Sequence, residues 1–166
     1  SDVWWSTDGV QWTQVVDPAE WPARAEHETV VYDERMWVFA GASGSALSDV
    51  WYSDNGADWT SATLTATWDA RCSTASCVWH NSLWVLGGTT GTRKNDVWFT
   101  TALGSKWQKE VEVGPWGKRC GHTMIALNNR LWLLGGYDYD SGSGGTREVW
   151  SSADGVSWSL VTNSAP

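Results

Sequence analysis

The sequence predicts an all-β fold made of repeated, four-stranded antiparallel units. The first observation is a repeat: the phrase Asp-Val-Trp, with Glu for Asp in its last copy, begins at residues 2, 49, 96 and 148, at steps of 47, 47 and 52 residues. The second is local composition, because the segments between these landmarks are short runs of β-branched and aromatic residues bounded by Gly, Asn, Asp and Ser. A repeat of this length is typical of one supersecondary unit stacked many times.

The tryptophans follow the same period. Fourteen of the sixteen fall in register with the repeat, and only Trp5 and Trp79 do not. Residues that recur at one position of every unit are expected to pack within or between units, so we interpret these side chains as core and not as a binding stripe. The fourteen are Trp4, Trp12, Trp21, Trp37, Trp51, Trp59, Trp68, Trp84, Trp98, Trp107, Trp116, Trp132, Trp150 and Trp158.

Each unit has four predicted strands in a fixed order. The first follows an Arg (24, 71 or 119), the second ends at a Gly-Gly or Ala-Gly pair, the third begins at Asp-Val-Trp, and the fourth begins at the next Trp. Turn residues separate the first two strands (33–34, 80–81, 128–129) and the last two (8–9, 55–56, 154–155). Asn-Gly and Asp-Gly pairs supply the positive φ that tight hairpins require, so all four strands are predicted to run antiparallel.

Three marks give the sequence a resemblance to the kelch-repeat β-propeller family. They are Arg-x-x-His at 24–27 and 119–122, the Gly-Gly doublet at 87–88 and 135–136, and the spaced aromatics that follow. The chain resembles a Trp-rich variant that carries the phrase Ser-x-Asp-Gly-x-x-Trp. It departs from the pattern at Thr74, where His is usual, at Ala40-Gly41 in place of the doublet, and in having Trp where the third strand usually has Tyr.

The resemblance implies kelch-type β-propeller blades of four antiparallel strands, with the Arg-x-x-His strand innermost. On this map residues 1–166 form a partial propeller of about three and a half blades: an outer half-blade at 1–15 and blades at 24–64, 71–113 and 119–163. Closed propellers have four to eight blades. We therefore expect a larger closed propeller, whose further blades come from the same polypeptide or from another chain.

Composition excludes several classes of function. The net charge is −8 and the eleven basic residues are scattered, which argues against a nucleic-acid partner. No apolar stretch reaches the eighteen or so residues of a membrane-spanning helix, so no membrane insertion is expected. The three cysteines lack zinc spacing, and we predict neither a metal site nor a cofactor. The Trp-rich variant resembles repeats of secreted and cell-surface proteins, which favours that location slightly over the cytoplasm.

Repetition also bears on catalysis, because catalytic groups normally occur once. The Ser-x-Asp-Gly-x-x-Trp phrase is similar to the Asp-box of sialidases, where it forms a structural turn at the blade periphery. His27, His122 and the recurring Arg24, Arg71 and Arg119 are predicted to tie strands or blades together. We therefore predict that the protein is not an enzyme. A glycan-binding or glycan-processing propeller, or a copper enzyme like galactose oxidase, stays open as an alternative.

One repeat position is a candidate binding site. Ala25, Cys72 and Cys120 each follow the recurring Arg directly. Resemblance to kelch adaptors implies that this position faces the mouth of the central channel and contributes to ligand pockets. We expect two free thiols there in preference to a disulfide. Cys77, which replaces Val30 and Ile125 of the other units, is expected to be a buried core thiol.

The loops between second and third strands complete the candidate site. They lie at 42–48, 89–95 and 137–147, at the same predicted end as Ala25, Cys72 and Cys120, and the third is four residues longer than the others. We predict a protein-interaction or scaffolding module that binds a protein, or a glycan, through this end. Asp-x-Asp at 138–140 could bind calcium, but no Glu stands at the required spacing, and a flexible, solvated loop is favoured. The remaining candidate residues are Arg93, Lys94, Tyr137, Asp138, Tyr139 and Asp140.

Overall fold

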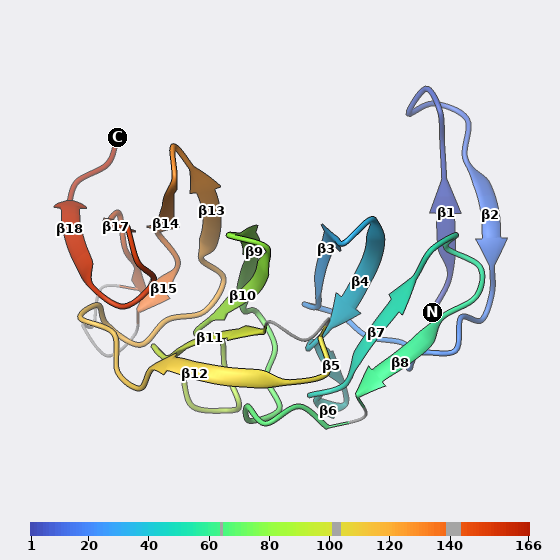
Figure 1. Ribbon diagram of the computed structural model, residues 1–166, viewed down its shortest axis with the longest axis horizontal. Helices are drawn as coiled ribbons and strands as arrows, with labels where there is room; N and C mark the ends of the chain where they lie inside the picture. Colours follow the sequence, from blue (N-terminus) through green and yellow to red (C-terminus); the bar gives the residue numbers. More distant parts are fainter. Residues whose placement is uncertain (64, 101–103, 139–143) are drawn as a thin grey trace.

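The computed structural model describes residues 1–63, 65–100, 104–138 and 144–166, and within these ranges it contains strands and connections but no helix. Three four-stranded antiparallel sheets stand side by side along an arc, and a two-stranded sheet stands at one end of it (Figure 1). The prediction of an all-β fold of kelch-type blades is confirmed. The three complete sheets are here called blades one, two and three, in chain order, and the two-stranded sheet is called the half-blade.

The strands of each blade pair in chain order, as the repeat predicted. The first strands, β3, β9 and β13, contact one another and line the inner side of the arc (Figure 1). The half-blade contains β1 (Val3–Trp5) and β2 (Thr13–Val16). The blades contain β3 (Glu28–Tyr32), β4 (Arg35–Phe39), β7 (Val50–Ser53) and β8 (Thr60–Thr63); β9 (Ala75–Trp79), β10 (Ser82–Leu86), β11 (Val97–Thr100) and β12 (Trp107–Val111); and β13 (Thr123–Leu127), β14 (Arg130–Leu134), β17 (Val149–Ser152) and β18 (Trp158–Thr162).

The turn between the first two strands is a two-residue hairpin in every blade. Both of its residues have positive φ, 51° and 58° at Asp33 and Glu34 and 52° and 58° at Asn128 and Asn129. Two consecutive positive values define the type I′ turn, whose twist matches that of the flanking strands. Asn and Asp tolerate this conformation better than most residues. This preference explains why the turns could be predicted from the sequence.

In blades one and three the turn between the last two strands is held by a side chain. In blade three the carboxylate oxygen Oδ1 of Asp154 accepts hydrogen bonds from the amides of Val156 and Ser157, at 2.9 and 2.7 Å. In blade one the amide oxygen of Asn55 accepts the two equivalent bonds, both at 2.9 Å. The structural interpretation of the Ser-x-Asp-Gly phrase is therefore confirmed.

The hydrophobic core lies between blades. Trp37 and Phe39 of blade one pack with Leu83 and Val85 of blade two in one cluster. Trp84 and Leu86 of blade two pack in the same way with Leu131 and Leu133 of blade three. Side chains of one strand alternate between the two faces of its sheet, so each blade uses one set of residues toward the preceding blade and the other set toward the following one.

Two expectations about buried residues are corrected. Trp4 and Trp12 of the half-blade are 47% and 58% exposed, although they share the repeat register with tryptophans that the blades bury. Among the described residues the half-blade has only two strands, which match the outer strands of a blade, so no inner strands cover these rings. Cys77 is only partly buried, at the edge of the cluster between blades two and three. Its burial still raises the pKa of the thiol to about 12.

Candidate functional site

A buried pair of charges fixes the geometry of each blade. The guanidinium of Arg71 donates to both carboxylate oxygens of Asp96, at 2.8 and 3.0 Å, and to the carbonyl of Gly87 at 2.9 Å. Arg24 makes the same bonds to Asp49 and the carbonyl of Ala40. The forked guanidinium suits such two-oxygen contacts. Removing one partner of a buried pair costs about 3–5 kcal/mol, so this frame holds the first, second and third strands together at one end.

Blade three uses the same frame with a longer acid. Arg119 donates to the carboxylate of Glu148 and to the carbonyl of Gly135. The side chains of all three Arg are fully buried. The prediction that these arginines tie strands together is confirmed. Their partner, the acid of the Asp-Val-Trp phrase, was not predicted from the sequence, although it recurs at the matching position.

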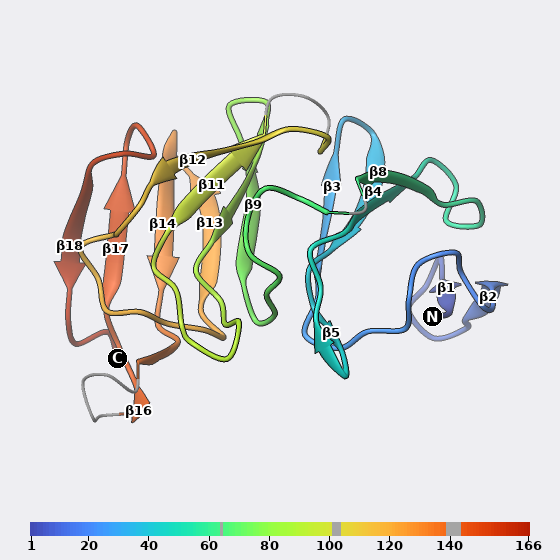
Figure 2. The same cartoon turned by 90° about the horizontal axis from the view of Figure 1, so that it is seen from below.

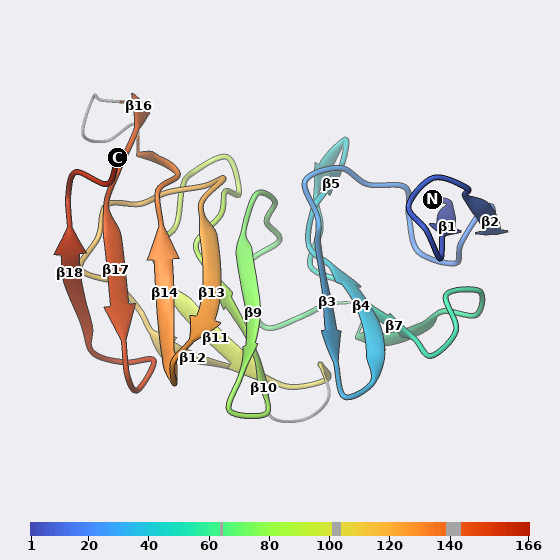
Figure 3. The same ribbon diagram turned by 90° about the horizontal axis from the view of Figure 1, so that it is seen from above.

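The loops after the second strands form small hairpins at this same end. In blade one the hairpin is β5 (Ala42–Ser43) with β6 (Ser45–Ala46), and in blade three it is β15 (Tyr137–Asp138) with β16 (Gly144–Gly145). In blade two a single bridge joins Thr89 and Arg93. Figures 2 and 3 show β5 and β16 projecting from the same end of the array. We call this end the loop face.

The candidate position after each Arg lies at the base of these hairpins. Ala25 forms a bridge with Ala42, Cys72 with Thr89, and Cys120 with Tyr137. Ala25 is exposed, and the two cysteines are partly buried free thiols, as expected. The structure thus brings the predicted position and the predicted loops into direct contact.

The residue two positions after the recurring Arg connects neighbouring blades through backbone hydrogen bonds. Glu26 and Ser73 have φ of 55° and 51°, a conformation that non-glycine residues seldom adopt, and Gly121 takes 61°. The amide of Ser73 donates to the carbonyl of Glu26, and the amide of Gly121 donates to the carbonyl of Ser73, both at 3.0 Å.

Burial and the neighbouring Glu26 raise the pKa of the Cys72 thiol. A thiol held protonated is a poor nucleophile.

A polar pocket of about 250 Å³ lies between the blade-two loop and the connector that leads to blade three. Lys94, Lys109 and Lys118 line it together with Asp69 and Glu112. Lys94 bonds the Asp69 carboxylate at 2.8 Å and lowers its pKa, while Lys109 bonds Glu112 at 2.7 Å. The ammonium of Lys109 also lies 4.9 Å from the centre of the Trp98 ring. This pocket offers both positively charged hydrogen-bond donors and negatively charged acceptors to a polar ligand.

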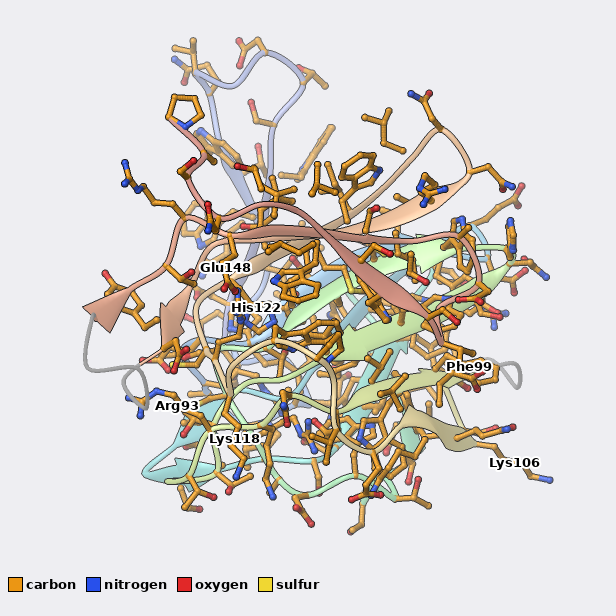
Figure 4. All side chains as sticks on the ribbon, turned by 90° about the vertical axis from the view of Figure 1, so that its left-hand side faces the viewer. Arg93, Phe99, Lys106, Lys118, His122 and Glu148 are labelled. Atoms are coloured by element: carbon orange, nitrogen blue, oxygen red, sulfur yellow. The ribbon has the colours of Figure 1, made fainter. Side chains whose placement is uncertain are left out.

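Basic side chains lie at both ends of the array. Figure 4 shows Arg93 and Lys118 on one side of the array and Lys106 on the opposite side. Lys94 and Lys118 line the same pocket. Of the predicted basic residues, Lys94 is thus brought into a pocket, while Arg93 lies in the hairpin above it.

The predicted acidic loop is only partly as expected. Tyr137 is about half exposed, but Asp138 is buried, with its carboxylate packed against the backbone of Gly117. The expectation of a solvated loop is therefore wrong for Asp138, because its side chain points back toward the connector. Tyr139 and Asp140 lie outside the described residues.

Several residues of this end were not identified from the sequence. Asp69, Lys109 and Lys118 lie in connectors or outer strands, outside the loop that carries Lys94, yet they line the same pocket. Glu26 and Ser73 gave a usable signal, since they share the repeat position two residues after the Arg. The meeting of a loop with the following connector depends on how the blades stack, and no local pattern reports it.

The histidine at the end of the Arg-x-x-His phrase connects blades. The ring nitrogen Nε2 of His122 lies 3.1 Å from the carbonyl of Leu86 in the preceding blade. Burial and Arg119 lower the pKa of His122 to about 3, so the ring is neutral.

Within the described ranges no three His, Cys, Asp or Glu side chains come together as metal ligands, and no helix could cross a membrane.

Comparison with known families agrees with this architecture. The family model described as the KLHDC2/KLHL20/DRC7 Kelch-repeats domain matches residues 2–136. None of the curated proteins matches the chain. The match covers most of the sequence, and the chain belongs to the kelch-repeat family. Domains of this family generally mediate protein–protein interaction and are typically not enzymes.

Proposed function

We propose that this chain binds a protein partner through its loop face. The observation that carries the proposal is the convergence of hairpins from successive blades beside Ala25, Cys72 and Cys120, over a frame of buried Arg–acid pairs. A rigid scaffold that presents loops at one end is a common way to build a recognition surface. At the opposite end, the turns between first and second strands are two-residue hairpins.

The polar pocket beside Lys94 supports a polar contact with that partner. Lys94 and Lys118 line this pocket together with Asp69 and Glu112. Ion pairs at exposed positions contribute at most about 1 kcal/mol each, so a partner can exchange them for its own contacts at small cost. Carboxylate or amide side chains on an extended peptide would find matching groups here.

The test is selection of binding peptides from a displayed random-peptide library, followed by affinity measurement on two double variants. Lys94→Ser with Lys118→Ser removes two charges at the loop face. Lys106→Ser with Arg130→Ser removes two charges at the opposite end and serves as the matched control. We expect the first variant to weaken binding at least about tenfold, equivalent to ~1.4 kcal/mol, and the control to leave it unchanged.

Equal loss in both variants, or no loss in either, would contradict the proposal. Melting temperatures of the two variants identify any general loss of fold. A glycan array probed with the same proteins addresses the alternative: glycan binding that is lost only in the loop-face variant would replace the protein partner by a glycan.

A further inference from the structure

The lysines of the polar pocket interrupt the repeat in blade two. Lys94, Lys109 and Lys118 all line this pocket. The matching positions of the other blades are occupied by neutral residues, which are Leu47, Ser61 and Ala70 in blade one, and Thr146 and Leu160 in blade three. The architecture of a blade therefore does not require these three charges, and they remain available for recognition.

The pocket lies toward the outer side of blade two. Its walls come from the third and outermost strands, β11 and β12, and from the two connectors that flank the blade. Cys72 and Cys120, which lead into the innermost strands β9 and β13, are not among its lining residues. The pocket is therefore a separate place on the loop face, distinct from the position at the inner strands.

Hydrogen bonds fix both connectors to the blade. The buried side-chain amide of Asn95 donates to the carbonyls of Gly114 and Trp116, each at 3.0 Å, and the amide of Gly114 donates to the carbonyl of Asn95 at 2.8 Å. A Cβ at Gly114 would lie 2.5 Å from the Trp116 ring, so this close approach needs glycine. On the other wall the hydroxyl of Thr67 donates to the carbonyl of Trp107 at 3.1 Å. The walls of the pocket are thus formed before any ligand arrives.

In each ion pair of the pocket the acid is more exposed than the lysine. The side chains of Lys94 and Asp69 are 29% and 67% exposed, and those of Lys109 and Glu112 are 34% and 77% exposed. The ammonium of Lys109 also lies 4.9 Å from the centre of the Trp98 ring. Exposed ion pairs contribute little to stability. The acids can therefore turn away into solvent while the lysines stay in the pocket.

The charges of the pocket leave one positive charge uncompensated. Asp96 also lines the pocket, but Arg71 already neutralises it. Asp69 and Glu112 compensate two of the three lysines. No ion pair to Lys118 occurs among the residues that the structure describes, and this side chain is exposed. A ligand with a single negative charge would therefore neutralise the pocket.

We propose that the pocket binds one carboxylate side chain, Asp or Glu, of the protein partner. The carboxylate pairs with Lys118 and replaces Asp69 or Glu112 at its lysine. A lysine ammonium has only donors, so a carboxylate suits the three lysines better than an amide does. Val113, 67% exposed beside the pocket, offers an apolar contact to the neighbouring partner residue. The inference rests on the proposed binding at the loop face and adds the chemistry of one partner residue.

Two libraries of short displayed peptides test the proposal. Both have random flanks, and the central residue is fixed as Glu in one and as Gln in the other. We expect the unmodified chain to recover about tenfold more binding clones from the Glu library. Clones recovered equally from both libraries, but lost with Lys94→Ser and Lys118→Ser, would overturn the carboxylate assignment and leave binding at the loop face in place. Failure to recover clones from either library would overturn both.

A double-mutant cycle then locates the carboxylate. One selected Glu peptide and its Gln counterpart are measured on the unmodified chain, on Lys118→Gln, and on the matched control Lys106→Gln, which changes the opposite side of the array (Figure 4). We expect the change from Glu to Gln to weaken binding about tenfold on the unmodified chain and the control, and less than about twofold on Lys118→Gln. Added salt should weaken only the Glu peptide, because it screens exposed charges.

Two further outcomes would contradict the assignment. Equal loss from Glu to Gln on the unmodified chain and on Lys118→Gln would mean that the carboxylate binds elsewhere on the protein. Binding about tenfold tighter for a phosphoserine peptide than for the Glu peptide would assign the pocket to a phosphate group. Equal melting temperatures of the three proteins would show that the fold is the same in each.

Discussion

At the level of single residues, positively charged side chains have different roles that depend on their neighbours. Arg71 is buried with Asp96 as its charge partner and stabilises its blade, whereas Lys94, in the loop of the same blade, stays partly exposed and lines a pocket. His122 is neutral because burial and a nearby guanidinium disfavour its charged form. Burial and the neighbouring charges therefore separate residues that stabilise blades from residues that remain available to a partner.

Glu28 gives a prediction on pH. It lies on β3 and accepts from the hydroxyl of Ser76 on β9 at 2.6 Å, and burial raises its pKa to about 7. A carboxyl whose pKa is raised on folding stabilises the fold below its unfolded value and loses that contribution as pH rises through the folded value. The free energy of unfolding should therefore fall between about pH 4.5 and 7, by roughly 1–3 kcal/mol.

Glu28→Gln should remove this fall, because the amide does not titrate. Urea unfolding at pH 5 and pH 8 measures it in both proteins. A wild-type chain and a Gln variant with the same pH dependence over this range would show that Glu28 ionises normally.

At the level of elements, each hairpin of a blade has its own turn chemistry. The inner turns depend on two residues with positive φ, and the outer turns of blades one and three depend on one side chain that accepts hydrogen bonds from two amides. These devices are local, which is why they could be recognised without knowledge of the fold.

Replacing Asp154 tests whether the outer turn of blade three depends on its side-chain acceptor. Asp154→Ala should lower the free energy of unfolding by about 1–2 kcal/mol, since it leaves two amides without their acceptor. Asp154→Asn should cost much less, because Asn55 already performs the same task in blade one. Thermal or urea unfolding measures both, and equal costs for the two variants would show that charge and not hydrogen bonding matters at this turn.

At the level of the whole molecule, stability resides between blades. Each blade buries one apolar face against its neighbour, and the half-blade leaves the corresponding face of blade one partly open. The arrangement resembles other repeat architectures, in which each unit contacts only the next.

Two substitutions at the same repeat position should reveal the difference between a covered and a partly open blade face. Leu83→Ala should cost about 2–5 kcal/mol, because it empties a site buried between blades one and two. Met36→Ala should cost less than about 1 kcal/mol, because no inner strands cover that side chain. Urea unfolding measures both. A large cost for Met36→Ala would mean that this side chain is already covered in solution.

The sequence predicted much of this fold because its signals are local and recur. A residue with positive φ, an Asp that accepts the next amides, and a tryptophan at a fixed period each act within one hairpin or one unit, so they can be recognised one at a time. For the same reason the position after the Arg was found, since it recurs three times, at Ala25, Cys72 and Cys120.

The tertiary structure decided which distant residues pair, as Arg71 does with Asp96 and Lys94 with Asp69. It also decided that Lys118 lines the same pocket as Lys94, and that the carboxylate of Asp138 lies against Gly117. The exposure of Trp4 and Trp12 was decided there too, against the expectation from their register. By itself the sequence determined the unit, its strand order and its turns. How much of each unit is covered, and which distant charges meet, depends on the stacking of blades, because burial is set by whatever packs on a face and not by the residues of that face alone.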